Sequence, residues 1–280
     1  MQPLVSVIIP CYNHEHYIED SIQSIIEQTY SRIELIIIDD GSKDKSVEKI
    51  QSMLPACEQR FERVYFNTRP NKGLCATLNE ALTHCQGKYL SIIASDDMML
   101  PNKTQLQVDY LEQHPDVTGV FAGIELIDSN NRVVDRRVST RTEYSFNDIL
   151  LNLHDLPTLT QMFHLKDIVE AGGYDESIKV EDWYMLLKLS KQQKILKYIP
   201  EVVCQYRIHD ESFSQNGLKM AVEMMKVIQP YHAEKSFLDA EFKINRSILK
   251  YYYKPQGAFK YYPAKYLTYL KYFLNKLIRR

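Results

Sequence analysis

Short apolar runs alternate with helical patterns over the first hundred residues. Ile18, Ile22 and Ile25 show the helical spacing, in which apolar residues recur every three or four positions. The apolar runs are rich in β-branched residues and predict buried strands at 4–10, 33–38, 63–66 and 89–94. Strands that alternate with helices in this way predict an α/β fold, with a mostly parallel sheet flanked by helices.

Polar residues mark where the helices between these strands begin. Asn13 and Ser42 each follow a predicted strand, and both residue types are suited to cap a helix. Gly73 turns the chain into a third helix, which Gly87 closes.

The pattern is more varied beyond residue 100. Helices are predicted at 101–114, 145–153, 165–171 and 180–191, and strands at 117–128, 132–138, 195–199 and 202–206. From about residue 217 the chain is predicted to be helical to its end, with breaks near Pro230, Pro255 and Pro263. We therefore expect a domain over 1–215 and a helical extension over 216–280.

Charge is distributed unevenly along the 280 residues, although the net charge is only −2. Ten Lys and Arg and no Asp or Glu lie in 243–280, so residues 1–242 hold the other 24 basic and all 36 acidic side chains. The body of the chain, 1–242, is therefore acidic, and its tail, 243–280, is basic. This asymmetry indicates that the tail meets an anionic surface.

Aromatic and apolar residues accompany the cations of this tail. Eight tyrosines and two phenylalanines lie in 243–280, and one apolar stripe contains Leu267, Leu270, Phe273, Leu274 and Leu277. A basic amphipathic helix with interfacial aromatics is typical of an anionic membrane surface. The alternatives are packing against the rest of the chain and a homodimer interface. Nucleic acid is disfavoured, because the body is acidic and carries no recognition motif.

The five cysteines are scattered and include no C-x-x-C pair, which is typical of reduced thiols in a cytosolic protein. No apolar run reaches the length of a membrane span, and the chain enters a strand at once, without room for a signal peptide. We expect a cytoplasmic protein, or a peripheral one at the inner face of the cytoplasmic membrane.

Two pairs of adjacent acids follow predicted strands: Asp39-Asp40 and Asp96-Asp97. The carboxyl ends of parallel strands face one crevice, where such sheets bind ligands. Neighbouring carboxylates at the end of a buried strand are costly unless a cation lies between them. The pattern indicates Mg²⁺ or Mn²⁺, which in turn would hold a phosphate-bearing ligand.

Four segments in order, VSVIIPCYNHEHYIEDSIQSIIEQTY, ELIIIDDGSKDKS, RPNKGLCATLNEAL and GKYLSIIASDD, closely resemble family 2 glycosyltransferases. The resemblance covers about residues 4–210. It implies the Rossmann-like GT-A fold, with 1–100 as the nucleotide-binding half and 101–215 as the acceptor-side half.

The resemblance also implies roles in donor binding. Pro10, Tyr12 and Asp40 would line the nucleotide base pocket, Asp39 would support it, and Asp96 would meet the ribose. A carboxylate only accepts hydrogen bonds, which suits Asp40 to the imide N–H of uracil. The alternative for Asp40 is a turn acid that caps the next helix.

Further residues are implied at the diphosphate and the metal. Asp97 would bind Mn²⁺ or Mg²⁺, and His209 of the Y-R-x-H pattern would complete the metal shell or touch the diphosphate. Gly73 would let the backbone approach the donor, and Arg69 or Lys72 would offset the diphosphate charge. The alternatives are a surface turn for Asp97 and solvated loop residues for Arg69 and His209.

Glu181 and Asp182 begin a predicted helix and resemble the family's E-D motif. The resemblance implies an inverting transfer in which Asp182 is the general base. The alternative is an acid pair that only stabilises the helix N-terminus. The processive Q-x-x-R-W element is absent, since Gln205-Tyr-Arg-Ile-His stands in its place, so we expect transfer of one sugar.

The resemblance implies an inverting transferase that moves one sugar from a nucleotide-sugar, expected to be a UDP-sugar. The expected acceptor is a hydroxyl of a surface polysaccharide, a lipopolysaccharide or another lipid-linked glycan. One alternative is a catalytically silent binding or scaffold protein. Another is a sugar nucleotidyltransferase, but residues 10–12 lack the glycine-rich signature that it would need. His14 and His16 are interpreted as surface or capping residues.

Overall fold

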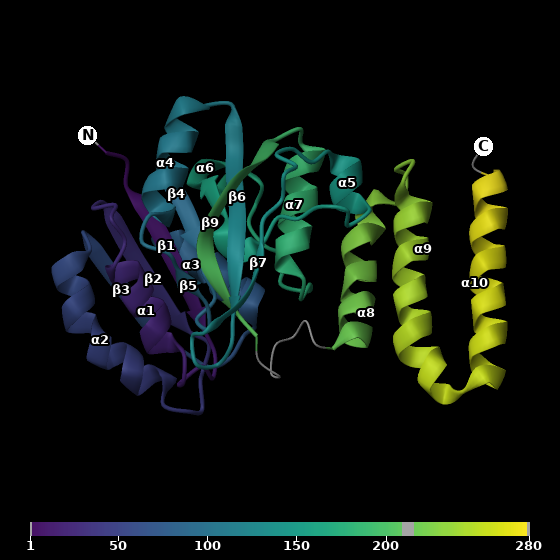
Figure 1. Cartoon of the computed structure of the whole chain (residues 1–280), viewed down its shortest axis with the longest axis horizontal. Helices are drawn as coiled ribbons and strands as arrows, with labels where there is room; N and C mark the ends of the chain where they lie inside the picture. Colours follow the sequence, from purple (N-terminus) through teal and green to yellow (C-terminus); the bar gives the residue numbers. More distant parts are fainter. Residues whose placement is uncertain (1, 209–215, 279–280) are drawn as a thin grey trace. The chain divides into compact units, whose positions relative to one another are not determined.

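The chain folds into two units in this computed structural model, which describes residues 2–208 and 216–278 (Figure 1). The first unit comprises Met1–Tyr144, Asp155–Glu176 and Lys188–His209, and the second comprises Ser145–His154, Ser177–Leu187 and Asp210–Arg280. The second unit therefore includes two segments that lie before the boundary expected at residue 215.

A nine-stranded sheet forms the centre of the first unit, in the order β3-β2-β1-β4-β8-β6-β9-β5 with β7 on β6. The strands are β1 Val5–Cys11, β2 Ile33–Asp39, β3 Arg63–Thr68, β4 Tyr89–Ile92, β5 Met98–Met99, β6 Val117–Ile127, β7 Val133–Arg137, β8 Met162–His164 and β9 Ile195–Arg207. Strands β1 to β4 pair in parallel, as do β6 and β9. Strands β5, β7 and β8 pair antiparallel to their neighbours. The predicted α/β sheet is confirmed, and its second half is mixed.

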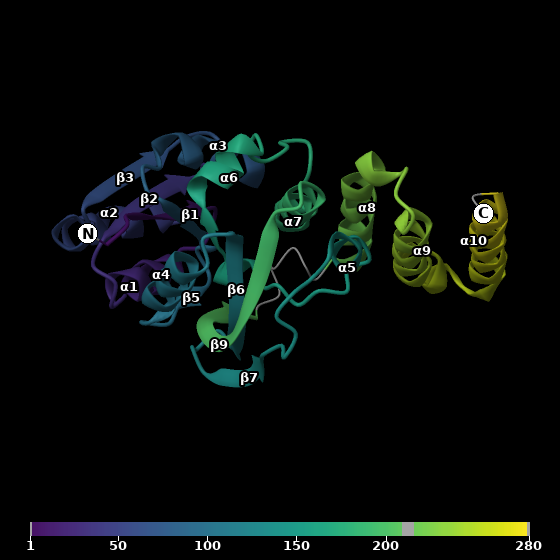
Figure 2. The same cartoon turned by 90° about the horizontal axis from the view of Figure 1, so that it is seen from above.

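Helices cover both faces of this sheet (Figure 2). They are α1 Ile18–Ile26, α2 Ser46–Arg60, α3 Leu74–His84, α4 Lys103–Gln113 and α6 Leu165–Glu170. Val7, Ile9 and Ile37 pack with Ile22 in one buried cluster, because alternate residues of a strand point to the same face. The residues between them, such as Ile8, point to the other face and are equally buried.

The strand predictions differ from the structure where the pattern is short or interrupted. Strand β9 runs unbroken from Ile195 to Arg207, where two strands were predicted, and its pairing with β6 is irregular near Ile199. The two- and three-residue strands β5 and β8 were missed, because so few residues show no periodicity.

The second unit is helical, with α5 Phe146–Leu150, the start of α7 Glu181–Lys191, α8 Gly217–Ile228, α9 Phe237–Ile248 and α10 Ala258–Ile278. The indole of Trp183 on α7 donates a 2.7 Å hydrogen bond to the Ile149 carbonyl of α5. This contact joins two segments that are distant from the C-terminal helices in sequence.

Prolines interrupt this helical region at two of the three expected places. Pro230 lies in a 3-10 turn, Gln229–Tyr231, and Pro255 lies in another, Lys254–Gln256. The break expected at Pro263 is wrong, because α10 continues through it. Among residues 2–208 and 216–278, no helix is long and apolar enough to cross a membrane.

Candidate active site

The loops after β1 and β2 are joined by hydrogen bonds between residues that were expected to cap helices. The Asn13 backbone N–H donates to Ser42 Oγ at 2.9 Å, and Asn13 Oδ1 accepts from the Lys43 backbone N–H at 2.8 Å. The cap predictions are wrong, since α1 begins at Ile18 and α2 at Ser46. Adjacent parallel strands end side by side, so the two polar side chains cross-link the loops instead.

Pro10 and Tyr12 lie on either side of Cys11 at the carboxyl end of β1. Pro10 pairs in register with Ile38 of β2, and the Tyr12 side chain is exposed. Burial raises the pKa of the Cys11 thiol to about 11, so this cysteine is a packing residue. The contacts proposed between Pro10, Tyr12 and a nucleotide base stay predictions.

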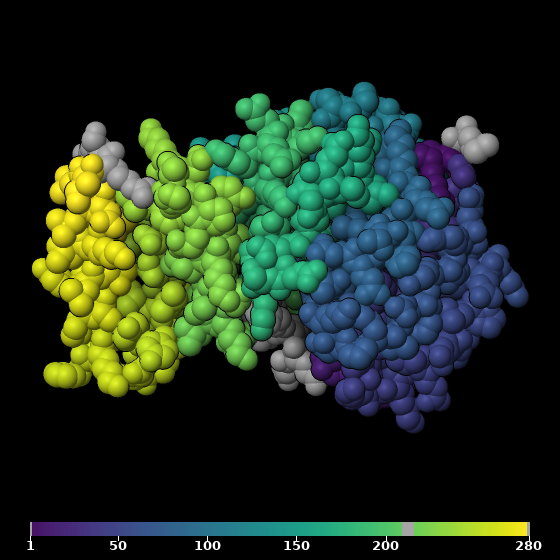
Figure 3. Space-filling view, turned by 180° about the vertical axis from the view of Figure 1, so that it is seen from behind, coloured from purple at the N-terminus to yellow at the C-terminus, as the bar shows by residue number. Residues whose placement is uncertain are grey.

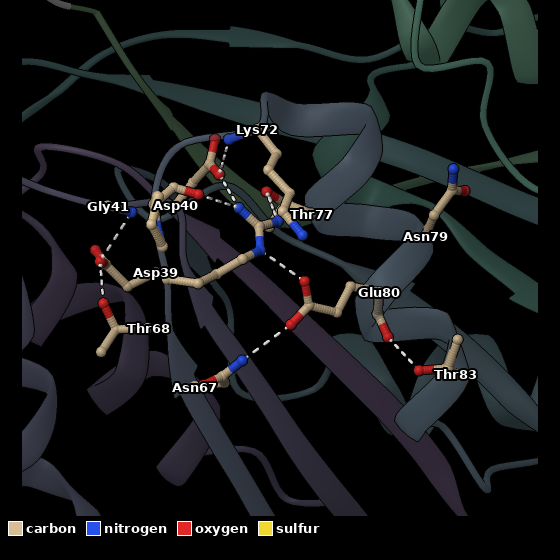
Figure 4. Close-up of polar contacts among 12 residues, drawn as sticks. Asp39, Asp40, Gly41, Asn67, Thr68, Lys72, Thr77, Asn79, Glu80 and Thr83 are labelled. Carbon is tan, nitrogen blue, oxygen red and sulfur yellow. Dashed lines mark hydrogen bonds and ion pairs between the residues drawn. The ribbon is translucent and has the colours of Figure 1, made fainter.

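Asp39 ends β2 and holds the turn that follows it (Figure 4). Its Oδ2 accepts hydrogen bonds from the backbone N–H groups of Gly41 and Ser42, both at 3.1 Å, and from Thr68 Oγ1 at 2.8 Å. Asp39 Oδ1 is buried and has no hydrogen-bond partner among the described residues. These contacts hold the turn after β2, and the support of a nucleotide base pocket by Asp39 stays a prediction.

Asp40 is buried and binds the loop that follows β3 (Figure 4). Its Oδ1 accepts from the Lys72 backbone N–H at 2.8 Å and from the Arg69 guanidinium, and its Oδ2 accepts from the Gly73 backbone N–H at 2.9 Å. A carboxylate has about four acceptor sites. Asp40 Oδ2 therefore keeps one acceptor position for a ligand N–H, and its contact with a base stays a prediction.

Arg69 lies between two carboxylates and is largely buried. Its Nε donates to Glu80 Oε2 at 2.6 Å, its Nη2 donates to Thr77 Oγ1 at 2.9 Å, and its Nη1 donates to Asp40. The alternative of a solvated loop cation is thus excluded. The geometry favours a role for Arg69 in holding the loop against α3, and its contact with a diphosphate stays a prediction.

Gly73 is the last residue before α3 and has φ +94°, which side chains rarely adopt. A Cβ added there would meet no atom within 4 Å. Gly73 therefore satisfies the turn geometry and presents its backbone to open space. Approach of a donor to this backbone stays a prediction.

The second acid pair lies in the loop after β4. Asp97 is buried, and its Oδ1 accepts the Arg207 backbone N–H at 2.9 Å. Burial, and then the adjacent Asp96, raise the pKa of the Asp97 carboxyl well above its usual range, against the opposing effect of Arg207. Asp97 is therefore no surface turn residue.

His14 is part of this second site, contrary to its interpretation as a surface or capping residue. His14 Nδ1 lies 2.7 Å from Ser95 Oγ and 3.9 Å from Asp96 Oδ1, and its side chain is largely buried. The loop after β1 brings His14 across to β4, its neighbour in the sheet. His16 is exposed, as expected.

Arg207 is a site residue that the sequence analysis missed. Its Nε donates to the Asp96 carbonyl at 2.8 Å, and its Nη1 donates to the Asp128 carbonyl at 3.2 Å and to Asn131 Oδ1. Its Nη2 lies 3.4 Å from Asp20 Oδ2, and the side chain is fully buried. The Y-R-x-H pattern, whose arginine is Arg207, was a signal in the sequence that could have identified it.

The acids at β4 fit a divalent cation. Burial beside Asp96 makes the charged form of Asp97 costly, as its raised pKa shows. A nearby cation would offset that cost. Among the described residues, no three His, Cys, Asp or Glu side chains cluster as a complete metal cage. A cation shared with substrate phosphates needs only one or two protein carboxylates. His209, the second expected ligand, lies outside the described residues.

Glu181 and Asp182 begin α7 in the second unit. Burial, and then the adjacent Asp182, raise the pKa of Glu181 to about 8. Asp182 Oδ1 accepts the Trp183 backbone N–H at 2.6 Å. The raised pKa means that Glu181 keeps its proton at neutral pH. The role of Asp182 as general base stays a prediction.

A sequence model described as "Glycosyl transferase family 2" matches residues 6–170. The "Uncharacterized glycosyltransferase RT0329" of Rickettsia typhi is 31% identical over 79% of this chain and 69% of its own length. A longer glycosyltransferase of Rickettsia bellii is 29% identical and is covered over 31% of its length. WfgD of Escherichia coli, named a "UDP-Glc:alpha-D-GlcNAc-diphosphoundecaprenol beta-1,3-glucosyltransferase", is 28% identical over 77% of this chain and 81% of its own.

Solved structures of glycosyltransferases share the fold. Mannosyltransferase PcManGT from Pyrobaculum calidifontis, in complex with GDP-Man and Mn²⁺, superposes with a TM-score of 0.65 at 18% identity, over 98% of this chain and 81% of its own. TarS from S. aureus, in complex with UDP-GlcNAc, gives a TM-score of 0.60 at 17% identity, over 89% of this chain and 67% of its own. These likenesses confirm the predicted GT-A fold.

Proposed function

Because the chain belongs to glycosyl transferase family 2, we propose that it transfers one sugar from a UDP-sugar to a hydroxyl of a lipid-linked glycan, with inversion. The observation that carries this proposal is the buried Asp97 beside Asp96 in the loop after β4. Such a pair suits a cation that also holds a diphosphate, and Asp40 follows β2, which β1 separates from β4 in the same sheet. The donor and acceptor classes are supported by WfgD, whose name describes UDP-Glc and a diphosphoundecaprenol-linked acceptor.

Donor binding would use residues of the first unit. The free acceptor position of Asp40 suits the imide N–H of uracil, and Asp96 is suited to accept from a ribose hydroxyl. Asp97 would hold Mn²⁺ or Mg²⁺, which when bound neutralises charge on the diphosphate leaving group. Arg207 and His14 would keep the Asp96-Asp97 loop in place through the contacts described above.

Asp182 would take the proton of the acceptor hydroxyl as its oxygen attacks the anomeric carbon. The new glycosidic bond forms as the bond to the diphosphate oxygen breaks, so the nucleotide diphosphate leaves with the bonding electrons. One such displacement inverts the anomeric configuration. Glu181, which keeps its proton at neutral pH, would not compete as a base.

Donor binding is tested by calorimetric titration with UDP, GDP and dTDP, each with and without Mn²⁺. We expect UDP alone to bind tightly, with Mn²⁺ strengthening it, and Asp97→Ala to abolish the Mn²⁺ effect. The exposed Asp116→Asn is the matched control. Preference for GDP or dTDP would contradict the donor, and unchanged Mn²⁺ dependence in Asp97→Ala would remove Asp97 from the metal site. Absence of binding to any nucleotide would favour the silent scaffold.

The base is tested with Asp182→Asn. We expect near-normal UDP affinity with a loss of transfer of at least about a hundredfold, since general-base catalysis contributes that much or more. The assay is release of UDP from a UDP-sugar in the presence of a lipid-linked glycan acceptor, with Asp116→Asn again as control. Turnover that survives in Asp182→Asn would place the base elsewhere.

A further inference from the structure

Helix α10, Ala258–Ile278, leaves an apolar and aromatic face uncovered. Six of its side chains, at least 40% exposed each, form what we call the exposed stripe: Tyr262, Tyr266, Leu270, Phe273, Leu274 and Leu277. Their spacing of three and four residues places them along one side of the helix. A continuous apolar face of this kind on a folded protein marks an interaction surface.

The opposite side of α10 packs on α9 within the second unit (Figures 1 and 3). The Phe242 ring of α9 stacks on Tyr272 at 4.2 Å and meets Tyr269 edge-on at 4.8 Å. Asp239 of α9 accepts a 2.6 Å hydrogen bond from Lys276. These contacts fix the rotation of α10, so that the exposed stripe points away from α9.

Lysines border the exposed stripe on both sides. At 100° per residue, Lys260 and Lys271 follow one margin of the stripe, and Lys265 follows the other. Lys276 is paired with Asp239 of α9 and is not counted among these flanking lysines. Helix α10 contains no acidic residue. An anionic surface would complement these charges. A second copy of the chain would instead bring two rows of lysines together, and like charges repel.

We propose that α10 lies in the plane of an anionic lipid membrane surface. The exposed stripe would enter the boundary between headgroups and acyl chains, and the flanking lysines would extend to lipid phosphates. Tyrosine rings are suited to this interface, because one end is apolar and the other polar. Four lysines along the helix favour a position on the membrane over a span through it.

This orientation would also place the second unit at the membrane. Trp183, which follows Asp182, lines a cavity of about 80 Å³ together with Ala240 and Ile244 of α9. The start of α7 thus borders the same cavity as α9, the helix that holds α10. If the proposed function holds, the candidate base would sit in the unit that docks where a lipid-linked acceptor resides.

The test is flotation of the full chain with vesicles of phosphatidylcholine, with and without phosphatidylglycerol, in the absence of any sugar donor or acceptor. We expect binding to the anionic vesicles that falls at high salt. Leu270→Glu/Leu277→Glu should reduce the partition coefficient at least about tenfold, since it removes two leucines that would enter the membrane and adds negative charge. Lys260→Gln/Lys271→Gln should reduce it about tenfold on anionic vesicles alone.

The matched control is Val134→Glu/Val169→Glu, which adds the same charge at exposed valines of the first unit. It should lower partition far less than Leu270→Glu/Leu277→Glu, and all variants should keep the wild-type circular dichroism spectrum. The proposal is wrong if wild type does not float with anionic vesicles, or if Leu270→Glu/Leu277→Glu floats like wild type. It is also wrong if sedimentation shows a dimer that this variant converts to a monomer.

Failure of this test is distinguishable from failure of the proposed function. The vesicles contain no glycan, so binding to them does not depend on the proposed transfer. Asp182→Asn should float like wild type while losing transfer, whereas Leu270→Glu/Leu277→Glu should keep wild-type affinity for UDP.

Discussion

Arg207→Lys tests whether the buried guanidinium holds the donor site together. Arg207 donates to the Asp96 and Asp128 carbonyls and to Asn131, and its guanidinium carbon lies 4.8 Å from the centre of the Tyr17 ring. Lysine keeps the charge but presents one ammonium, which cannot reach acceptors on three segments. Loss of two such charged hydrogen bonds, at about 1.5–3 kcal/mol each, predicts destabilisation by about 3–6 kcal/mol.

The assay is urea unfolding followed by circular dichroism, with the UDP titration in Mn²⁺ on the same samples. Asp97 accepts the backbone N–H of residue 207, which lysine retains, so weaker UDP binding would report the displaced Asp96 peptide. Arg136→Lys is the control, because Arg136 is largely exposed and should change stability by less than about 1 kcal/mol. If Arg207→Lys unfolds within about 0.5 kcal/mol of wild type, the guanidinium does not organise this site.

Three further substitutions test buried groups. Because the pKa of Glu181 is raised, its carboxyl in the folded state keeps a proton between pH 4.5 and about 8, so stability should fall as the pH rises through that window. Glu181→Gln should flatten this fall when urea midpoints at pH 5 and 9 are compared. An unchanged slope would contradict the role of Glu181. Burial lowers the pKa of Lys103 in the folded state to about 8. Between pH 8 and 10.5 the folded state has lost this proton and the unfolded state still binds it, so stability should rise with pH. Lys103→Met should abolish that rise in thermal melts, and its persistence would assign it to another group. Gly119→Ala should cost about 1–3 kcal/mol in urea unfolding, because its Cβ would overlap the Phe163 ring, and a neutral effect would show that the ring moves freely.

Local pattern was enough to predict most of the sheet and the place of its acids. The apolar runs that became β1 to β4 are long enough to show a strand pattern; Asp39 ends β2, and Asp97 lies in the loop after β4. A parallel sheet brings the carboxyl ends of its strands to one edge. The position of these acids on that edge therefore followed from the chain itself, as did the acid pair at the start of α7.

Contacts between distant segments were decided only by the tertiary structure. Asn13 and Ser42 look like helix caps in sequence, yet they bond to each other's loops, because neighbouring strands end side by side. His14 reaches Ser95 across the sheet for the same reason. Arg207 resembles any strand residue until folding surrounds it with three carbonyl and amide oxygens. Hydrogen-bond partners separated by dozens of residues depend on sheet order, which no local periodicity contains.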